Sequence, residues 1–147
     1  MAFRARYIGI SNTDYPLVNG NEYDIILLNS DVYFEIIQFH VINTGYDFQM
    51  ESNNLYPINE IEQINMIEDR LRIKSEMKYH RNVKKVICIS DDVSIVKKGN
   101  TYNVEEYRNN FGHNYLINGI WYHCDYFKSL NEYRKEQIKN ILDICLK

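Results

Sequence analysis

An internal repeat is the feature of this sequence that most constrains its fold. Residues 7–25 contain a short apolar run, a polar stretch, an Asn-Gly-Asn turn and a second apolar run, and residues 86–104 contain the same succession with Lys-Gly-Asn at the turn. Three pairs align at a constant shift of 79 residues: Ile10 with Ile89, Gly20 with Gly99, and Tyr23 with Tyr102. Because such a repeat indicates two copies of one supersecondary unit, we expect two small domains instead of one continuous core.

Each copy also ends on a similar aromatic segment. Residues 55–61 align with residues 121–127 at a shift of 66, so the second copy is 13 residues shorter between its first hairpin and its closing segment. The missing residues fall where a loop is expected, and the repeat is therefore compatible with one strand order in both halves.

Strand signals fill the space between these ends. The first copy has apolar runs at 32–42 and 46–50, and the second has runs at 101–107, 113–117 and 120–123. Asn118-Gly119 separates the last two runs and is the strongest short signal for a two-residue hairpin. With the repeated blocks, five short strands per half are predicted.

This order of a long first loop, three meandering strands and a closing helical turn resembles a Src-homology-3-like barrel over 4–64 and 84–130. The resemblance implies tandem small β-barrels of the kind found in phage and mobile-element proteins of low-GC bacteria. The Ala-Leu-Tyr-Asp-Tyr strand and tandem Trp of the peptide-binding members are absent, so recognition of proline-rich ligands is not implied.

Helical periodicity appears between the two barrels and at the C-terminus. Asn59 and Glu62 can cap a helix that is clearest at 66–79, and Ser129 and Glu132 form a capping box for a second one. We therefore predict a mainly β protein with two helices, divided as follows: first barrel 1–65, helical linker 66–83, second barrel 84–128, C-terminal helix 129–147.

Each helix has an apolar stripe that is expected to pack. The first stripe comprises Ile61, Ile64, Ile67 and Leu71, and the second comprises Leu130, Tyr133, Ile138, Ile141, Leu142 and Cys145. Packing on the barrels is the simplest role for the C-terminal face, and a homodimer through the helices is the alternative.

Charge is distributed unevenly along the chain. Residues 1–65 carry two basic and nine acidic residues, and residues 66–85 carry seven basic and three acidic ones. An acidic barrel repels nucleic acid and favours a basic protein partner, and exposed Tyr suits protein interfaces. The predicted partner-binding residues are Asp14, Tyr15, Glu22, Asp24, Asp31, Tyr33, Glu35, Tyr46 and Asp47. The basic residues that could contact nucleic acid or a partner are Arg70, Arg72, Lys74, Lys78, Arg81, Lys84 and Lys85.

Signatures of catalysis are missing from the sequence. Glycine motifs do not surround any Ser or Cys as in a nucleophile elbow, and the six glycines are isolated and form no phosphate-binding loop. The three cysteines have no Cys-x-x-Cys spacing, and His123-Cys124-Asp125 is expected to diverge because adjacent strand residues point to opposite faces. We therefore expect no enzyme activity, no cofactor and no metal site.

The combined features predict a non-catalytic inhibitor. Many Ile, Asn and Tyr codons with few Ala codons fit an AT-rich genome of a low-GC bacterium or its phage. We expect a cytoplasmic, anti-CRISPR-like protein that binds a host defence factor through an acidic, Tyr-rich surface, and no membrane partner because no run of about 20 apolar residues exists. A nucleic-acid-binding regulatory barrel and an immunity protein that neutralises a toxin are the alternatives.

Overall fold

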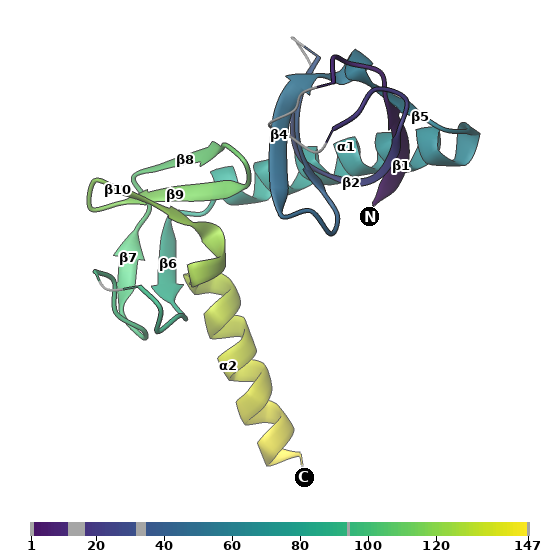
Figure 1. Cartoon of the computed structure of the whole chain (residues 1–147). Helices are drawn as coiled ribbons and strands as arrows, with labels where there is room; N and C mark the ends of the chain where they lie inside the picture. The colour runs from purple at the N-terminus through teal and green to yellow at the C-terminus, as the bar shows by residue number, and fades with distance from the viewer. Residues whose placement is uncertain (1, 12–16, 32–34, 94, 147) are drawn as a thin grey trace. The chain divides into compact units, whose positions relative to one another are not determined.

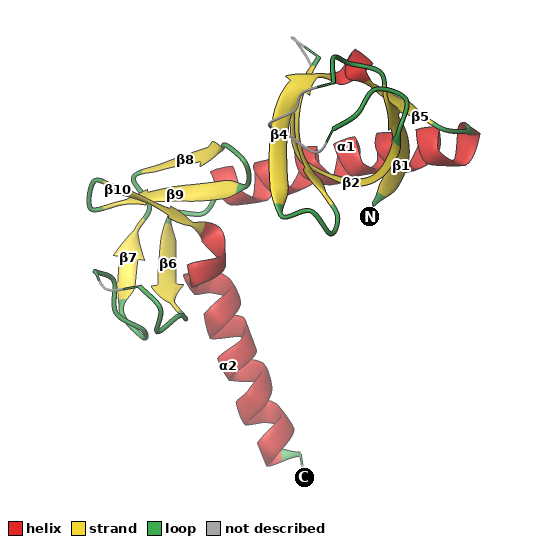
Figure 2. Cartoon of the chain, viewed as in Figure 1, coloured by secondary structure: helices red, strands yellow, loops and turns green. Residues whose placement is uncertain are grey.

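The computed structural model describes residues 2–11, 17–31, 35–93 and 95–146. It divides into two compact units, of which unit 1 comprises Met1–Lys78 with Asn109–Gly112 and unit 2 comprises Tyr79–Arg108 with His113–Lys147 (Figure 1). Strands dominate both units, and there are two long helices among the described residues (Figure 2). The predicted class, mainly β with two helices, is confirmed.

Unit 1 is built on one antiparallel five-stranded sheet. Its elements in chain order are β1 (Phe3–Tyr7), β2 (Glu22–Asp31), β3 (Ile36–Val41), β4 (Tyr46–Glu51), the 3-10 turn η1 (Ser52–Asn54), β5 (Leu55–Pro57) and helix α1 (Glu60–Arg81). The strand order is β4-β3-β2-β1-β5. Alternate side chains such as Phe3, Ile25, Ile37 and Phe39 form the core, which the α1 residue Ile73 joins.

Unit 2 holds two three-stranded sheets. Its elements are β6 (Lys85–Cys88), β7 (Thr101–Asn103), β8 (Glu106–Asn109), β9 (His113–Ile117), β10 (Ile120–His123), the 3-10 turn η2 (Cys124–Tyr126), β11 (Phe127–Ser129) and helix α2 (Leu130–Cys145). The sheets have the orders β10-β9-β8 and β11-β6-β7. The core of unit 2 contains Val86, Tyr115, Ile117, Tyr122 and Phe127.

The ladders are open where closed barrels were expected. In the described part of unit 1, β4 and β5 are the two edges of the sheet, and in unit 2 the strands belong to two separate sheets. The turns η1 and η2 redirect the chain before β5 and β11, and each of these short strands pairs with the first strand of its unit. The described strands therefore form a β-rich protein, but their hydrogen bonds do not close the sheets into barrels.

The two glycine turns of the repeat have the same hydrogen-bonding pattern. The N–H of Gly20 donates to the carbonyl of Tyr7 at 2.7 Å, and the N–H of Gly99 donates to the carbonyl of Cys88 at 2.8 Å. The two glycines have φ angles of 90° and 87°, a region that L side chains avoid. Tyr23 and Tyr102 act alike too, because each hydroxyl accepts a backbone N–H five residues upstream at 2.9 Å. The alignment of the turns at a shift of 79 is confirmed.

The ungapped alignment of the preceding strands is wrong. Since Gly20 bonds to Tyr7 and Gly99 to Cys88, the first strands are related by a shift of 81, so the loop of the second copy is two residues shorter. The closing segments also differ from the prediction. Leu55 pairs with Tyr7 and Phe127 pairs with Cys88, which gives a shift of 72 instead of 66.

The caps of both helices are confirmed, but the predicted apolar faces are not buried. The Asn59 side chain accepts the N–H of Glu62 at 2.9 Å, and Ser129 accepts that of Glu132 at 3.2 Å. On α1 the buried face is Met66, Asp69 and Ile73, which leaves the whole predicted stripe exposed: Ile61, Ile64, Ile67 and Leu71. The interior acid Asp69 breaks the hydrophobic pattern, and hydropathy alone therefore selects the wrong face.

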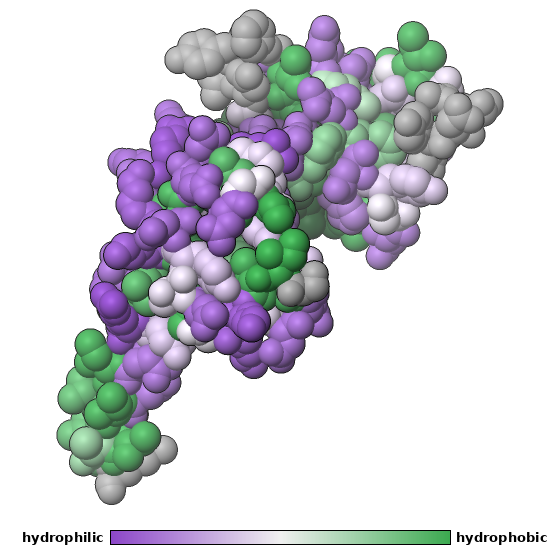
Figure 3. Space-filling model, turned by 90° about the vertical axis from the view of Figure 1, so that its left-hand side faces the viewer, coloured by the Kyte–Doolittle hydropathy of each residue, from purple (hydrophilic) through white to green (hydrophobic). Residues whose placement is uncertain are grey.

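Helix α2 has no fully buried residue: Leu130 and Tyr133 of the predicted apolar face are half-buried, and the prediction that the rest of this face packs on a barrel is wrong. Ile138 and Ile141 are about 60% exposed, and Ile144 and Leu146 are more so. In Figure 3 hydrophobic side chains gather toward the C-terminal end of this helix. Neither described helix is long and apolar enough to cross a membrane.

Candidate functional site

Three of the predicted partner-binding residues, Asp14, Tyr15 and Tyr33, lie outside the described residues. The others belong to unit 1. Asp31 is the last residue of β2, and Glu35 is in the turn before β3. Tyr46 and Asp47 begin β4. The described members of the predicted set are therefore distributed over two strands, β2 and β4, and one turn of a single sheet.

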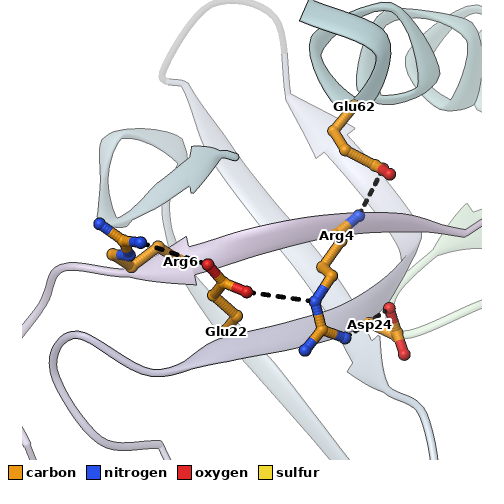
Figure 4. Close-up of polar contacts among 5 residues, drawn as sticks. All are labelled: Arg4, Arg6, Glu22, Asp24 and Glu62. Atoms are coloured by element: carbon orange, nitrogen blue, oxygen red, sulfur yellow. Dashed lines mark hydrogen bonds and ion pairs between the residues drawn. The ribbon is translucent and has the colours of Figure 1, made fainter. Parts of the chain in front are cut away.

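Two of these carboxylates are engaged in ion pairs on the β1–β2 ladder. Glu22 accepts from Arg6 at 3.2 Å and from Arg4 at 3.3 Å, and Arg4 also donates to Asp24 at 3.1 Å (Figure 4). The hydrogen bonds from Arg6 and then Arg4 lower the pKa of Glu22, and those to Asp24 and Glu22 raise the pKa of Arg4. The positive charges of Arg4 and Arg6 balance the negative charges of Glu22 and Asp24, so this part of unit 1 attracts a basic partner only weakly.

The β3–β4 hairpin is different, because it has no Lys or Arg. It runs from Ile36 to Glu51 and contains the carboxylates Asp47 and Glu51, both exposed. His40 Nδ1 lies 2.7 Å from Asp47, and Tyr46 is 50% exposed beside Phe48, with ring centroids 6.5 Å apart. Since β4 is an edge of the sheet among the described strands, this hairpin presents aromatic and acidic side chains together with an exposed strand edge.

The predicted basic stretch is divided between the two units. Arg70 lies 3.5 Å from Glu35, and Arg72 donates to the carbonyl of Leu27 at 3.1 Å and to Glu76 at 2.9 Å, so both are used inside unit 1. Lys74 and Lys78 also belong to unit 1, whereas Arg81, Lys84 and Lys85 belong to unit 2. Arg70 and Arg72 are therefore engaged within unit 1, and a contact of the other basic residues with nucleic acid or a partner stays a prediction.

A cleft of about 550 Å³ lies in unit 2 between the end of α1, the start of β6 and the start of α2. Its lining residues are Tyr79, Asn82, Val83, Lys84, Lys85, Ser129, Leu130, Asn131, Glu132, Arg134 and Lys135. Lys84 and Lys85 were among the basic residues predicted from the sequence, whereas Arg134 and Lys135 were not. No local signal connects these two pairs, because they are about 50 residues apart in the sequence and meet only in the folded unit.

The cleft is strongly cationic. Lys84, Lys85, Arg134 and Lys135 have no ion-pair partner among the described residues, whereas the nearby Lys128 is paired with Glu136 at 2.7 Å. Glu132 is the single carboxylate of the lining, and it shares a hydrogen bond with the hydroxyl of Tyr79, which also bonds to Ser129. Partial burial raises the pKa of this phenol, and the partly exposed ring of Tyr79 forms an aromatic wall of the cleft.

Histidine and tyrosine side chains form a cluster next to Tyr79 in unit 2. The rings of His80 and His113 stack with centroids 4.3 Å apart, and they hydrogen-bond with the hydroxyls of Tyr115 and Tyr107, respectively. Burial raises the pKa of Tyr115 far above its ordinary value. Because Tyr115 is buried and its hydroxyl is satisfied, this cluster is part of the core and not an open site.

The residues His123, Cys124 and Asp125 bring their ligand-type atoms within 4.8 Å of one another. The expectation that they diverge is wrong, because Cys124 begins the turn η2 and does not continue the strand. His123 Nδ1 accepts the backbone N–H of Asp125 at 3.2 Å, which occupies one of its two nitrogens. Among the described residues of unit 2, these three are candidates for holding a metal ion.

No protein-family model matches this chain, and neither a curated protein nor a solved structure is significantly similar to it. Function must therefore be inferred from the two surfaces described above, the acidic edge of unit 1 and the cationic cleft of unit 2.

Proposed function

We propose that this chain is a non-catalytic protein-binding inhibitor that attaches through unit 1 to a basic surface of a partner protein. The observation that supports it most is the exposed edge strand β4, which displays Tyr46, Asp47 and Glu51 in a hairpin without Lys or Arg. An edge strand can take up an extended segment of a partner by backbone hydrogen bonds, and its carboxylates would select a basic one.

The contact surface in this proposal is smaller than the acidic surface expected from the sequence. Glu22 and Asp24 are balanced by Arg4 and Arg6, so their charge is not available to a partner at long range. The proposal therefore centres on β4, because Glu35, although its side chain is 61% exposed, is paired with Arg70 at 3.5 Å. We assign Tyr46 the role of a rigid aromatic contact, because Tyr combines apolar area with a hydrogen-bonding hydroxyl.

The specific form of this proposal is a phage or mobile-element protein that blocks a host defence effector in the bacterial cytoplasm. Its support is the composition of the chain, typical of an AT-rich genome, and the basic channels that such effectors use for nucleic acid. An immunity protein against a basic toxin would use the same edge and differs in its partner.

Affinity capture from a low-GC bacterial lysate tests the proposal. The wild type is compared with a β4 variant, Asp47→Lys with Glu51→Lys, and with a matched control on exposed positions of α1, Glu60→Lys with Glu68→Lys. We expect a defence protein to be retained by the wild type and the control and lost by the β4 variant. Expression of the wild type should also reduce interference in a host with an active CRISPR system. Unchanged interference, with no partner that depends on β4, would exclude this function.

A further inference from the structure

We propose that the cationic cleft of unit 2 is a second binding site, which takes a single-stranded nucleic acid with its phosphates on the four cations and a base against Tyr79. This inference goes beyond the proposed function, because it concerns another unit and a ligand of opposite charge. A cleft of about 550 Å³ lies within the range of roughly 300–1,000 Å³ typical of ligand pockets.

Comparison of the two copies of the repeat shows why the charge of this cleft is uncompensated. With the strand shift of 81, Lys85 occupies the position of Arg4, and with the turn shift of 79, Asn103 occupies that of Asp24. Arg4 is neutralised by its cross-strand neighbour Asp24 at 3.1 Å, whereas Lys85 faces the neutral Asn103. The second copy thus has the cation of the first without its acid.

The start of the following helix is also held differently in the two copies. In unit 1 the carboxylate of Glu62, the third residue of α1, accepts the backbone N–H of Arg4 at 2.6 Å and ties the helix start to β1 (Figure 4). The equivalent residue of α2 is Glu132, which hydrogen-bonds with Tyr79 instead. Arg134 and Lys135 lie two and three residues further along α2, and they complete the cationic lining.

The chemistry of the lining favours a nucleic acid strand over other anions. Lys and Arg provide charge-assisted donors for phosphate oxygens, and Asn82 and Asn131 bring amide groups to the same cleft. Tyr79 is 43% exposed, and its ring is fixed by hydroxyl bonds to Ser129 and Glu132 and by an edge contact with His80 at 5.0 Å. A fixed, partly exposed ring beside a cationic groove is the arrangement on which single-stranded bases stack.

Fluorescence anisotropy with labelled 10-nucleotide DNA and RNA of mixed sequence tests this site on the full chain. Two double variants change the cleft: one combines Lys84→Ala and Lys85→Ala, and the other combines Arg134→Ala and Lys135→Ala. The control combines Lys97→Ala and Lys139→Ala, and it removes the same charge from exposed positions of unit 2 outside the cleft. We expect each cleft variant to raise Kd at least tenfold at 100 mM salt and the control to change it less than twofold.

Salt dependence gives a second readout. Four phosphate contacts to a single strand predict a slope of log affinity against log salt of about −3, and each cleft variant should reduce its magnitude by about 1.4. No binding by the wild type at 50 mM salt would overturn the proposal, as would an equal loss in the control variant. Equal circular dichroism spectra and melting temperatures establish that the variants are folded.

Competition on the wild type needs no variant and identifies the source of the phosphate. Displacement by unlabelled oligonucleotide, with inorganic phosphate and AMP much weaker, supports a strand as the ligand. Displacement by AMP at a similar concentration supports a free nucleotide in the same cleft. If polyglutamate displaces the labelled oligonucleotide as effectively as an unlabelled oligonucleotide of equal charge does, the assignment to nucleic acid is overturned.

The ring of Tyr79 provides the last test. We expect Tyr79→Phe to bind within about twofold of the wild type and Tyr79→Leu to bind about five- to tenfold more weakly, because stacking needs the ring and not the hydroxyl. Equal affinities of the Phe and Leu variants would exclude the stacking arrangement. The β4 variants of unit 1 should retain oligonucleotide binding, so failure of this site and failure of the proposed function are separable.

Discussion

The backbone N–H of Arg4 donates to a carboxylate oxygen of Glu62 at 2.6 Å, and this bond joins the first strand of unit 1 to the first turn of α1. The two residues are 58 positions apart, and the bond is partly buried. It is the contact that unit 2 lacks at the equivalent place, where Glu132 of α2 does not bond to the backbone of Lys85.

Removal of this carboxylate should destabilise unit 1. We expect Glu62→Gln to lower the free energy of unfolding by about 1–2 kcal/mol, because the N–H of Arg4 loses a charged acceptor. Urea denaturation followed by circular dichroism measures the change. Glu60→Gln is the matched control, since it removes an equally placed charge of the first helical turn from an exposed residue. A loss of equal size in both variants would attribute the effect to the helix dipole and not to the Arg4 bond.

The two repeated turns should respond alike to a Cβ atom. Gly20→Ala and Gly99→Ala should each cost about 1–2 kcal/mol, because both residues have φ near 90°. An added Cβ meets nothing within 4 Å at either position, so the cost is conformational and not steric. Thermal or urea unfolding of both variants checks this. Costs that differ by more than about 1 kcal/mol would show that the turns are not equivalent.

Tyr115 should make the protein sensitive to alkali. Burial raises the pKa of its phenol in the folded state, while in the unfolded chain a Tyr titrates near pH 10. The folded state therefore binds the proton more tightly, and the stability that depends on the neutral phenol is complete below pH 10. It is lost as the pH rises further, by up to about 1.4 kcal/mol per pH unit.

Comparison with Tyr115→Phe isolates this contribution, because the variant has no phenol to ionise. We expect the difference in unfolding free energy between wild type and variant to shrink as the pH is raised from 9 to 11. A difference that stays constant over that interval would contradict the assigned direction.

Helix α2 should tolerate changes in its apolar face. Leu142→Ala is expected to change the unfolding free energy by less than about 0.5 kcal/mol, because an exposed side chain loses little burial. Ile117→Ala, in the core of the same unit, should cost about 2–5 kcal/mol. Denaturation at low protein concentration measures both. A core-like cost for Leu142→Ala, together with a dimer in light scattering, would show that a second copy covers this face.

Local signals allowed several elements to be predicted from the sequence. The Asn118-Gly119 turn joins β9 to β10 as expected, with Ile117 opposite Ile120, because a positive φ at both turn residues selects this dipeptide. The capping residues Asn59 and Ser129 were recognisable for the same reason, since a cap depends on a side chain and a backbone amide three residues apart.

Features that depend on packing could not be predicted in this way. The buried face of α1 includes Asp69, which a hydropathy pattern assigns to solvent. The first strands of the two copies align at a shift of 81 because the loop that follows is two residues shorter in the second copy, and nothing in the composition of the loop indicates this difference. The cleft joins Lys84 and Lys85 to Arg134 and Lys135, and these pairs are brought together by β11, which adds to β6 and leads directly into α2.

Our central claim is that the two copies of the repeat have diverged into sites of opposite charge, and amide chemical-shift mapping of the full chain tests it most directly. A single-stranded oligonucleotide should perturb the amides of Lys84, Lys85 and Asn131–Lys135, and a basic peptide should perturb those of Tyr46–Glu51. Perturbation of one common set by both ligands, or of neither region, would contradict the claim.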